Sequence, residues 1–175
     1  MLIVFKILFL LAIWALSIMI GIAISKKYSN RVSELGEIIM ALEILEGRVN
    51  YTYDTIPEIF DFISRHLKTN IKNIFEYSSE KLAINKNFSA GEIFNTTIDE
   101  EKILLDLNDS DIEILKGLSV SLGQVDLENQ VKNIRLIIRS LTSQLEDARS
   151  EKEKNFKLCR NMGAIVGVLL IIILI

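Results

Sequence analysis

The sequence predicts an all-α protein in which about six helices form a central domain and one hydrophobic helix lies at each end. The first supporting observation is that 42 of the 43 charged side chains lie between Lys26 and Arg160. The second is a scarcity of turn residues, because the 175 residues include one proline and eight glycines and show no sustained alternation of apolar and polar residues. The third is that apolar residues in the charged region recur at helical spacing.

Residues 2–24 form the first hydrophobic block. As a helix, this block would be about 35 Å long, which is enough to cross a hydrocarbon core of roughly 30 Å. Its only charge is Lys6, near the start, where a lysine stem can reach the membrane interface. The apolar stretch is longer than that of a typical secretory signal and no clear cleavage site follows it. We therefore expect an uncleaved transmembrane anchor.

Residues 161–175 form the second block, which carries no charge. From Met162 the block would measure only about 21 Å as a helix, and an extension back to Leu158 brings it to about 27 Å. A buried or interfacial helix remains an alternative, because apolar runs of this length also occur in protein cores. The preferred interpretation is a second transmembrane helix.

Cationic residues flank both blocks on the side of the central region. They are Lys26, Lys27 and Arg31 after the first block, and Lys152, Lys154, Lys157 and Arg160 before the second. The positive-inside rule therefore predicts that residues 26–160, including membrane-proximal stalk helices, face the cytoplasm. The single cysteine, Cys159, agrees with a reducing compartment because it cannot form an internal disulfide.

Both blocks contain small residues four positions apart, Ser17 and Gly21 in the first and Gly163 and Gly167 in the second. Such pairs allow helix backbones to approach closely in lipid. The two blocks could thus pack on each other, or a homo-oligomer could form through them.

Two apolar stripes mark long helices at the ends of the central domain. The first stripe comprises Tyr28, Val32, Leu35, Ile39, Leu42, Leu45 and Val49. The second comprises Leu127, Val131, Ile134, Ile138, Leu141, Leu145 and Ala148, with the alternating spacings of four and three of a heptad seam. Because the chain leaves and re-enters the same membrane face, we expect the two helices to run antiparallel with their seams in contact.

Helix starts are predicted from serine or threonine residues followed three positions later by glutamate, a spacing at which the two residues can cap each other's backbone N–H groups. These pairs predict helices that begin near residues 56, 90 and 111, with a further break near Lys68 and Thr69. The pairs are Thr55 with Glu58, Ser89 with Glu92, and Ser110 with Glu113.

The sequence offers little for catalysis or for binding cofactors, metals or nucleic acids. His66 is the only histidine, and no glycine-rich phosphate-binding motif is present. Residues 26–160 have a net charge of −4, from 19 cations and 23 anions, which does not favour nucleic acid as a partner. We predict a protein that is not an enzyme, although a membrane enzyme using carboxylates such as Asp126 and Glu128 remains a weaker alternative.

One polar segment is too specific for a simple turn. In the stretch Leu122, Gly123, Gln124, Val125, Asp126, the glycine suits the end of one helix and the aspartate the start of the next. Capping does not explain Gln124, or Asn129 and Gln130 beyond it.

This segment resembles the stage III sporulation protein AB family, which has an L-G-Q-S-D-x-x-x-Q stretch. The matching residues are Leu122, Gly123, Gln124, Asp126 and Gln130, with Val125 in place of the small polar residue. The family also has a tyrosine followed by a P-L-P-E-A-like stretch, to which Tyr51, Ile56, Pro57 and Glu58 are similar. The terminal anchors agree, so the resemblance covers essentially the whole chain.

The resemblance implies a fold and a role. The central domain would be similar to the helical domain of type II secretion F proteins. The protein would belong to the channel complex between mother cell and forespore, at the mother-cell membrane around the forespore. There it would act as an assembly platform that docks the stage III sporulation AA ATPase and contacts other channel-complex subunits. A membrane-anchored sensory or regulatory adaptor is the alternative.

Overall fold

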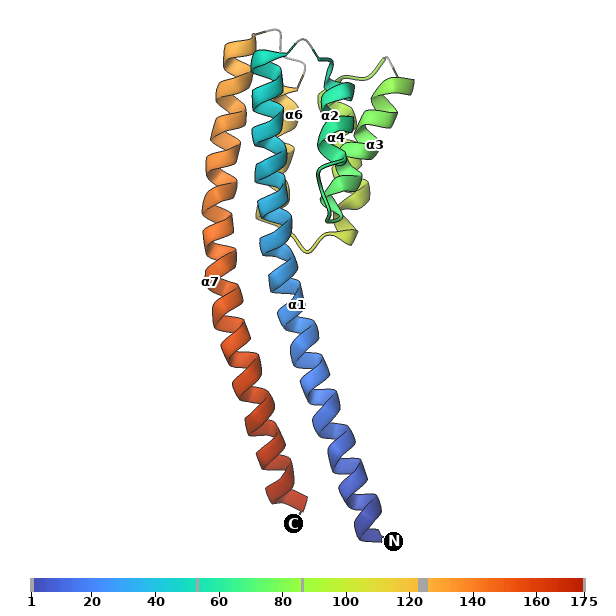
Figure 1. The fold of residues 1–175 in the computed structure, drawn as a ribbon, viewed down its shortest axis with the longest axis vertical. Helices are drawn as coiled ribbons and strands as arrows, with labels where there is room; N and C mark the ends of the chain where they lie inside the picture. Colours follow the sequence, from blue (N-terminus) through green and yellow to red (C-terminus); the bar gives the residue numbers. More distant parts are fainter. Residues whose placement is uncertain (1, 53, 86, 123–125, 175) are drawn as a thin grey trace. The chain divides into compact units, whose positions relative to one another are not determined.

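The computed structural model describes the backbone of residues 2–52, 54–85, 87–122 and 126–174. Side chains are described for residues 25–155 outside those gaps, and for Phe9, Ala12, Leu16 and Met19. The described residues form helices and contain no strand, which confirms the predicted all-α class (Figure 1). The helices are α1 (Leu2–Tyr51), α2 (Ile56–Ser64), α3 (Ile71–Ile84), α4 (Ala90–Glu101), the 3₁₀ turn η1 (Lys102–Leu104), α5 (Asp109–Lys116), α6 (Leu118–Ser121) and α7 (Leu127–Leu174).

The chain divides into two compact units. The terminal unit comprises Met1–Asn30 and Ala148–Ile175, and it contains the outer halves of α1 and α7. Within the part of the chain that the structure describes, no helix combines the length and hydropathy needed to cross a membrane. Most side chains of the two predicted spans, residues 2–24 and 161–175, lie outside that part. The same is true of Ser17, Gly21, Gly163 and Gly167.

The second unit, Arg31–Asp147, is the central domain. Its frame is the pair formed by the inner halves of α1 and α7, which run antiparallel as the two apolar stripes predict. Glu46 near the end of α1 accepts a 2.7 Å bond from Arg135 near the start of α7. Arg31, at the beginning of this unit on α1, bonds to Gln144, near its end on α7, with Arg31 Nη2 donating to Gln144 Oε1 at 3.1 Å. The predicted antiparallel pairing is therefore confirmed within this unit.

Five of the seven residues of the α7 stripe are buried, but only three of the seven on α1 are, and Ile38 and Ala41 beside that stripe are completely buried as well. Leu35, Leu42, Ile134 and Leu141 are completely buried. Leu127, the first member of the α7 stripe, is half exposed. The first turn of α7 thus leaves an apolar side chain on the surface.

Two of the three predicted helix starts are confirmed. The Thr55 backbone N–H donates to Glu58 at 2.8 Å, and α2 begins at the next residue. The Ser89 backbone N–H likewise donates to the Glu92 carboxylate at 2.8 Å, while the Ser89 hydroxyl accepts from the Glu92 backbone N–H at 3.2 Å. These hydrogen bonds lower the pKa of both glutamates. The predicted break near Lys68 is also present, between α2 and α3.

The third predicted start is wrong by two residues. Helix α5 is capped by Asn108, whose side chain accepts from the Asp111 backbone N–H at 2.8 Å, and Asp111 accepts in return from the Asn108 N–H at 3.0 Å. Ser110 lies inside the helix, with its hydroxyl oxygen accepting a 3.3 Å bond from Gln144. Asparagine and aspartate form the same reciprocal cap as serine and glutamate, and here they take precedence.

Helices α2, α3 and α4 form the core beside α1. Phe60, Phe75 and Phe94, one from each helix, are fully buried, and their ring centroids are 5.4 to 5.7 Å apart. Gly91 of α4 packs against α6 so closely that an added Cβ would lie 2.2 Å from the Ser119 carbonyl oxygen. Close helix packing here requires glycine.

Three polar side chains on α1 hold distant loops in place. Glu37 accepts from the backbone N–H groups of Lys68 and Thr69, in the α2–α3 loop, with the shortest distance 2.8 Å. Glu34, one turn earlier, accepts from the Asp106 N–H at 2.8 Å. Burial raises the pKa of Glu34 to about 7, and nearby Asp106 adds to this effect by charge repulsion.

The third of these side chains is Arg31. Its Nε and Nη2 donate to the two carboxylate oxygens of Asp111 at 2.8 and 3.1 Å. Asp111 is completely buried and the Arg31 side chain is almost so. The start of α5 is therefore fixed to α1 by a buried, two-pronged ion pair.

Candidate docking surface

The segment that carries the family resemblance is only partly described. Leu122 follows α6 and is buried. Gly123 and Gln124 lie outside the described residues. Asp126 caps α7, because its Oδ1 accepts from the backbone N–H groups of Glu128 at 3.1 Å and Asn129 at 3.4 Å. Gln130 is buried one turn into the helix. The predicted helix start at Asp126 is confirmed.

Pro57 and Glu58 lie in the first turn of α2. The Pro57 carbonyl oxygen accepts a 2.9 Å bond from the Ser79 hydroxyl of α3, and Glu58 completes the helix cap with Thr55. Figure 1 places the start of α2 and the start of α7 at the same end of the central domain, where α1 ends. No described hydrogen bond or ion pair joins them, so Pro57 and Glu58 act here as parts of a helix start.

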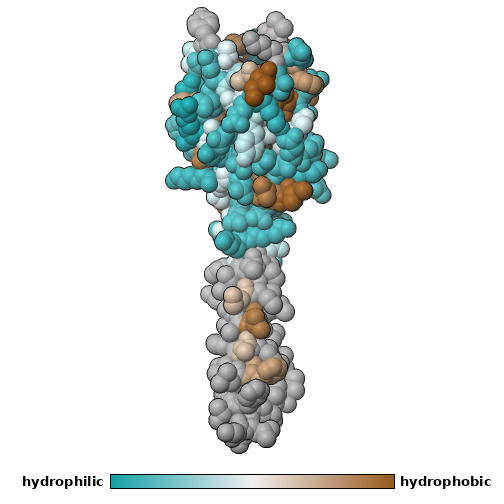
Figure 2. All heavy atoms as spheres, turned by 90° about the vertical axis from the view of Figure 1, so that its right-hand side faces the viewer, coloured by the Kyte–Doolittle hydropathy of each residue, from teal (hydrophilic) through white to brown (hydrophobic). Residues whose placement is uncertain are grey.

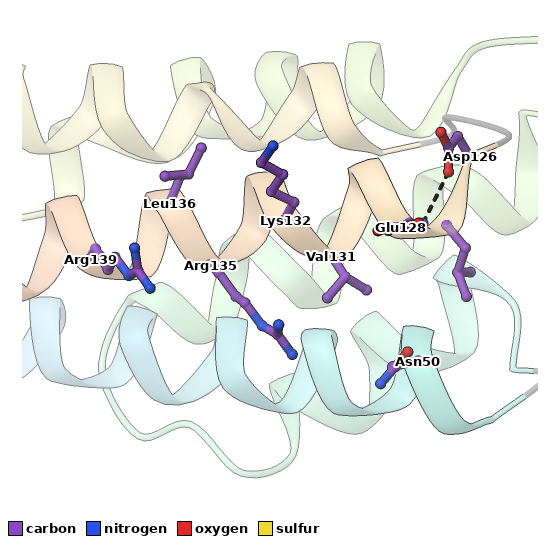
Figure 3. Close-up of a pocket in the computed structure, with 9 residues that line it drawn as sticks. Asn50, Asp126, Glu128, Val131, Lys132, Arg135, Leu136 and Arg139 are labelled. Carbon is purple, nitrogen blue, oxygen red and sulfur yellow. Dashed lines mark hydrogen bonds between the residues drawn. The ribbon is translucent and has the colours of Figure 1, made fainter.

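A surface groove of about 860 Å³ lies along the first four turns of α7, against the end of α1 (Figure 3). We call it the α7 groove. Val131 on its floor is buried, whereas Leu127 and Leu136 are each half exposed. The lining residues are Asn50, Asp126, Leu127, Glu128, Val131, Lys132, Arg135, Leu136 and Arg139.

Three cations give the α7 groove its charge. Lys132, Arg135 and Arg139 follow one another at spacings of three and four, which places them along one side of the helix. All three are exposed, and Arg135 reaches toward α1 to pair with Glu46, whereas Lys132 points away from α1 (Figure 3). Asp126 and Glu128 supply negative charge only at the helix start. The groove thus presents positive charge around the exposed Leu136, with a second exposed leucine, Leu127, at the helix start.

This row of cations was not predicted, although its spacing is visible in the printed sequence. The heptad pattern of α7 describes only its apolar residues and gives no role to the charged residues between them. A cation row next to Leu127 and Leu136 would have been a usable signal, since those leucines break the polar face. Elsewhere, hydrophilic residues cover most of the face of the domain in Figure 2, with hydrophobic residues in small patches.

The groove is better suited to binding a protein than to chemistry. Asp126 is held by the backbone of its own helix, and Glu128 is exposed in the first turn, so neither carboxylate has an activating partner among the described residues. No group of three potential metal ligands occurs in the described part of the chain. Apolar side chains surrounded by charge are typical of protein interfaces.

Comparison with known proteins identifies the family. The family model of stage III sporulation protein AB matches residues 6–175. Stage III sporulation protein AB of Bacillus subtilis (strain 168) is 27% identical over 154 residues, which cover 88% of this chain and 90% of that protein. A solved structure of stage III sporulation protein AB has a TM-score of 0.68 at 23% identity, covering 71% of this chain and 98% of the solved one. The chain belongs to the stage III sporulation protein AB family.

Proposed function

We propose that this protein is a non-enzymatic platform of the sporulation channel complex between mother cell and forespore. In this proposal residues 2–24 and 161–175 anchor it in the mother-cell membrane, and the central domain docks the stage III sporulation AA ATPase in the cytoplasm. Family membership supports the sporulation role. The hydropathy of the two terminal blocks and their cationic flanks support the anchoring and the orientation.

The observation that carries the docking proposal is the α7 groove, in which exposed Lys132 and Arg139 flank the exposed Leu136 and a second exposed leucine, Leu127, lies at the helix start. Cations at the edge of an interface steer an acidic partner, and exposed leucines supply apolar area that becomes buried on contact. We therefore assign the groove to an acidic, partly apolar surface of the ATPase. We further propose that the fold of the central domain is similar to that of type II secretion F proteins.

The direct test is binding of the AA ATPase to the full chain in detergent or nanodiscs. Charge reversal at two groove positions, Lys132→Glu with Arg139→Glu, should weaken binding by about tenfold or more, and the effect should shrink at high salt. The matched control is Arg65→Glu with Lys72→Glu, which makes the same change of net charge just after α2 and on α3 and should leave binding unchanged.

Two results would contradict the docking proposal. One is an absence of any association between the two folded wild-type proteins. The other is an equal loss of binding in the groove variant and the control, which would indicate a general charge effect rather than a site.

Orientation can be tested separately with a single reporter thiol. In a Cys159→Ser background, Ser150→Cys places one thiol on the exposed face of α7. A membrane-impermeant maleimide should label it only after the cells are permeabilised. Labelling in intact cells would place the domain outside the cytoplasm and remove the basis for docking a cytoplasmic ATPase.

A further inference from the structure

Two adjacent large apolar side chains are exposed on the turn η1. Ile103 is 85% exposed and Leu104 is 57% exposed. Exposed single hydrophobic residues are ordinary on protein surfaces, but consecutive ones on a tight turn are unusual because turns are normally built from polar residues. We therefore expect another surface to cover Ile103 and Leu104.

The turn is firmly held, so the two side chains are presented in a defined position. The Leu104 carbonyl oxygen accepts a 2.7 Å bond from the Asn70 side chain. Leu105 is buried directly after the turn, and the next backbone N–H, that of Asp106, donates to Glu34 of α1. An apolar pair on a fixed turn loses less conformational freedom on binding than one on a mobile loop.

The position of the turn within the central domain suggests what covers it. Glu34 and Arg31, which hold residues 106 and 111, lie in the first turns of α1 within this unit, and Gln144 lies in the last turns of α7. Hence η1 lies at the end of the domain where the chain both enters and leaves. From this end of the domain, the chain continues in both directions along the sequence to the apolar terminal blocks.

Chain length sets a limit on the distance to the first block. Only six residues lie between Ile24 and Arg31, so their Cα atoms are seven steps apart, a distance of at most about 25 Å even when the chain is fully extended. A helix of that length spans about 10 Å. If residues 2–24 cross the membrane, the end of the domain that carries η1 is within reach of the membrane surface.

The charges around the turn permit contact with lipid. Asp99 bonds to Lys102 at 3.1 Å and to Lys116 at 2.7 Å, and Glu100 pairs with Lys81. The lysines lower the pKa of Asp99. Two of the three acidic residues that precede the turn are thus paired with lysines, and the third, Glu101, accepts a 3.2 Å bond from the Asn73 side chain. Lys102 lies next to the apolar pair, where a cation can meet lipid headgroups.

We infer that η1 is a membrane-surface contact, in which Ile103 and Leu104 insert into the interfacial region of the bilayer that holds the anchors. This inference rests on the anchoring part of the proposed function. A third contact point, besides the two anchors, would fix how the central domain is tilted on the membrane.

Tryptophan quenching by brominated lipids tests the contact in the full chain reconstituted in phosphatidylcholine and phosphatidylglycerol vesicles. The natural sequence has one tryptophan, Trp14, inside the first block. In a Trp14→Phe background, Ile103→Trp and Leu104→Trp are two separate reporters of the turn. Ile84→Trp is the matched control, since Ile84 is 79% exposed but lies at the far end of α3 from the residue that bonds to Leu104.

The inference predicts that both turn reporters are quenched by bromine near the headgroups and show blue-shifted emission, whereas the Ile84→Trp reporter does neither. Wild-type Trp14 should be quenched by bromine deep in the acyl chains. If Trp14 is quenched but the turn reporters are not, the anchor stands and the surface contact is wrong. If Trp14 itself is not quenched, the anchoring fails and the contact fails with it.

Two further outcomes would also overturn the inference. Blue-shifted emission of the turn reporters that rises with protein density but is insensitive to bromine would mean that a second copy of the chain covers the pair. Equal quenching of the turn and Ile84→Trp reporters would mean that the domain lies on the lipid without a specific contact.

Discussion

Replacing Arg31 by methionine is expected to destabilise the central domain more than any exposed substitution. Asp111 has no solvent exposure and accepts two hydrogen bonds from Arg31 and one from the Asn108 backbone. Arg31→Met removes two of these three and leaves a buried carboxylate without its counter-charge. Breaking a buried pair in this way costs about 3–5 kcal/mol.

Asp111→Asn should lower the free energy of unfolding by less than Arg31→Met does. In Asp111→Asn the amide oxygen can still accept from Asn108, and Arg31 keeps its bond to Gln144. The double variant Arg31→Met with Asp111→Asn has no buried charge, so we expect it to recover at least half of the stability lost in Arg31→Met. Arg65→Met is the control, because that arginine forms an exposed pair with Asp61 worth less than about 1 kcal/mol.

Hydrogen exchange measured by mass spectrometry on peptides covering α5 suits this test, since it reads the stability of the domain apart from the terminal helices. A loss of 3 kcal/mol or more corresponds to exchange that is faster by about 100-fold or more. The reasoning is refuted if Arg31→Met changes exchange by less than about fivefold. It is also refuted if the double variant is destabilised by the sum of the single ones, because the two residues would then not be coupled.

Two other substitutions probe the interior. Glu34 holds its proton more tightly in the folded state, where its pKa is about 7 rather than 4.5, so its contribution to stability is lost as the pH rises from 4.5 to 7. After allowance for screening by water, the wild-type protein should lose on the order of 2 kcal/mol of unfolding free energy between pH 5 and pH 8, as measured by urea titrations, and Glu34→Gln should not show this loss. An equal change in both proteins would contradict this prediction. Gly91→Ala should lower the stability by about 1–3 kcal/mol because its Cβ would meet the Ser119 carbonyl oxygen. The control Gly47→Ala, with open space around it, should raise stability by up to about 1 kcal/mol, and thermal melts that move the same way for both would contradict the packing argument.

Local patterns in the sequence predicted much of the fold. The two apolar stripes predicted α1 and α7 and their antiparallel pairing, and Thr55 and Ser89 marked the starts of α2 and α4. These features could be predicted because caps and seams depend on residues three or four positions apart. The turn η1 and the short helix α6 were not predicted, since neither is long enough to show a helical period.

Long-range contacts account for what was missed. The helix start at residue 109 depends on Asp111, which is held by an arginine 80 positions earlier, and no local spacing reveals that. The same holds for Glu37, which caps a loop 31 positions away. At the candidate site, Asp126 could be assigned from its neighbours alone, but the α7 groove exists only because α7 meets the end of α1.

The antiparallel frame also determines when the domain can be completed during synthesis. Helices α2, α3 and α4 follow one another closely and can meet as soon as they leave the ribosome. The charged groups of α1 form their contacts with α7 later, because Arg135 is synthesised 89 residues after Glu46 and Gln144 is synthesised 113 residues after Arg31. At roughly 5–20 residues per second, that delay lasts on the order of 5–20 s. Chains that stop before α7 therefore expose one side of α1, and they are the ones most prone to aggregation or proteolysis.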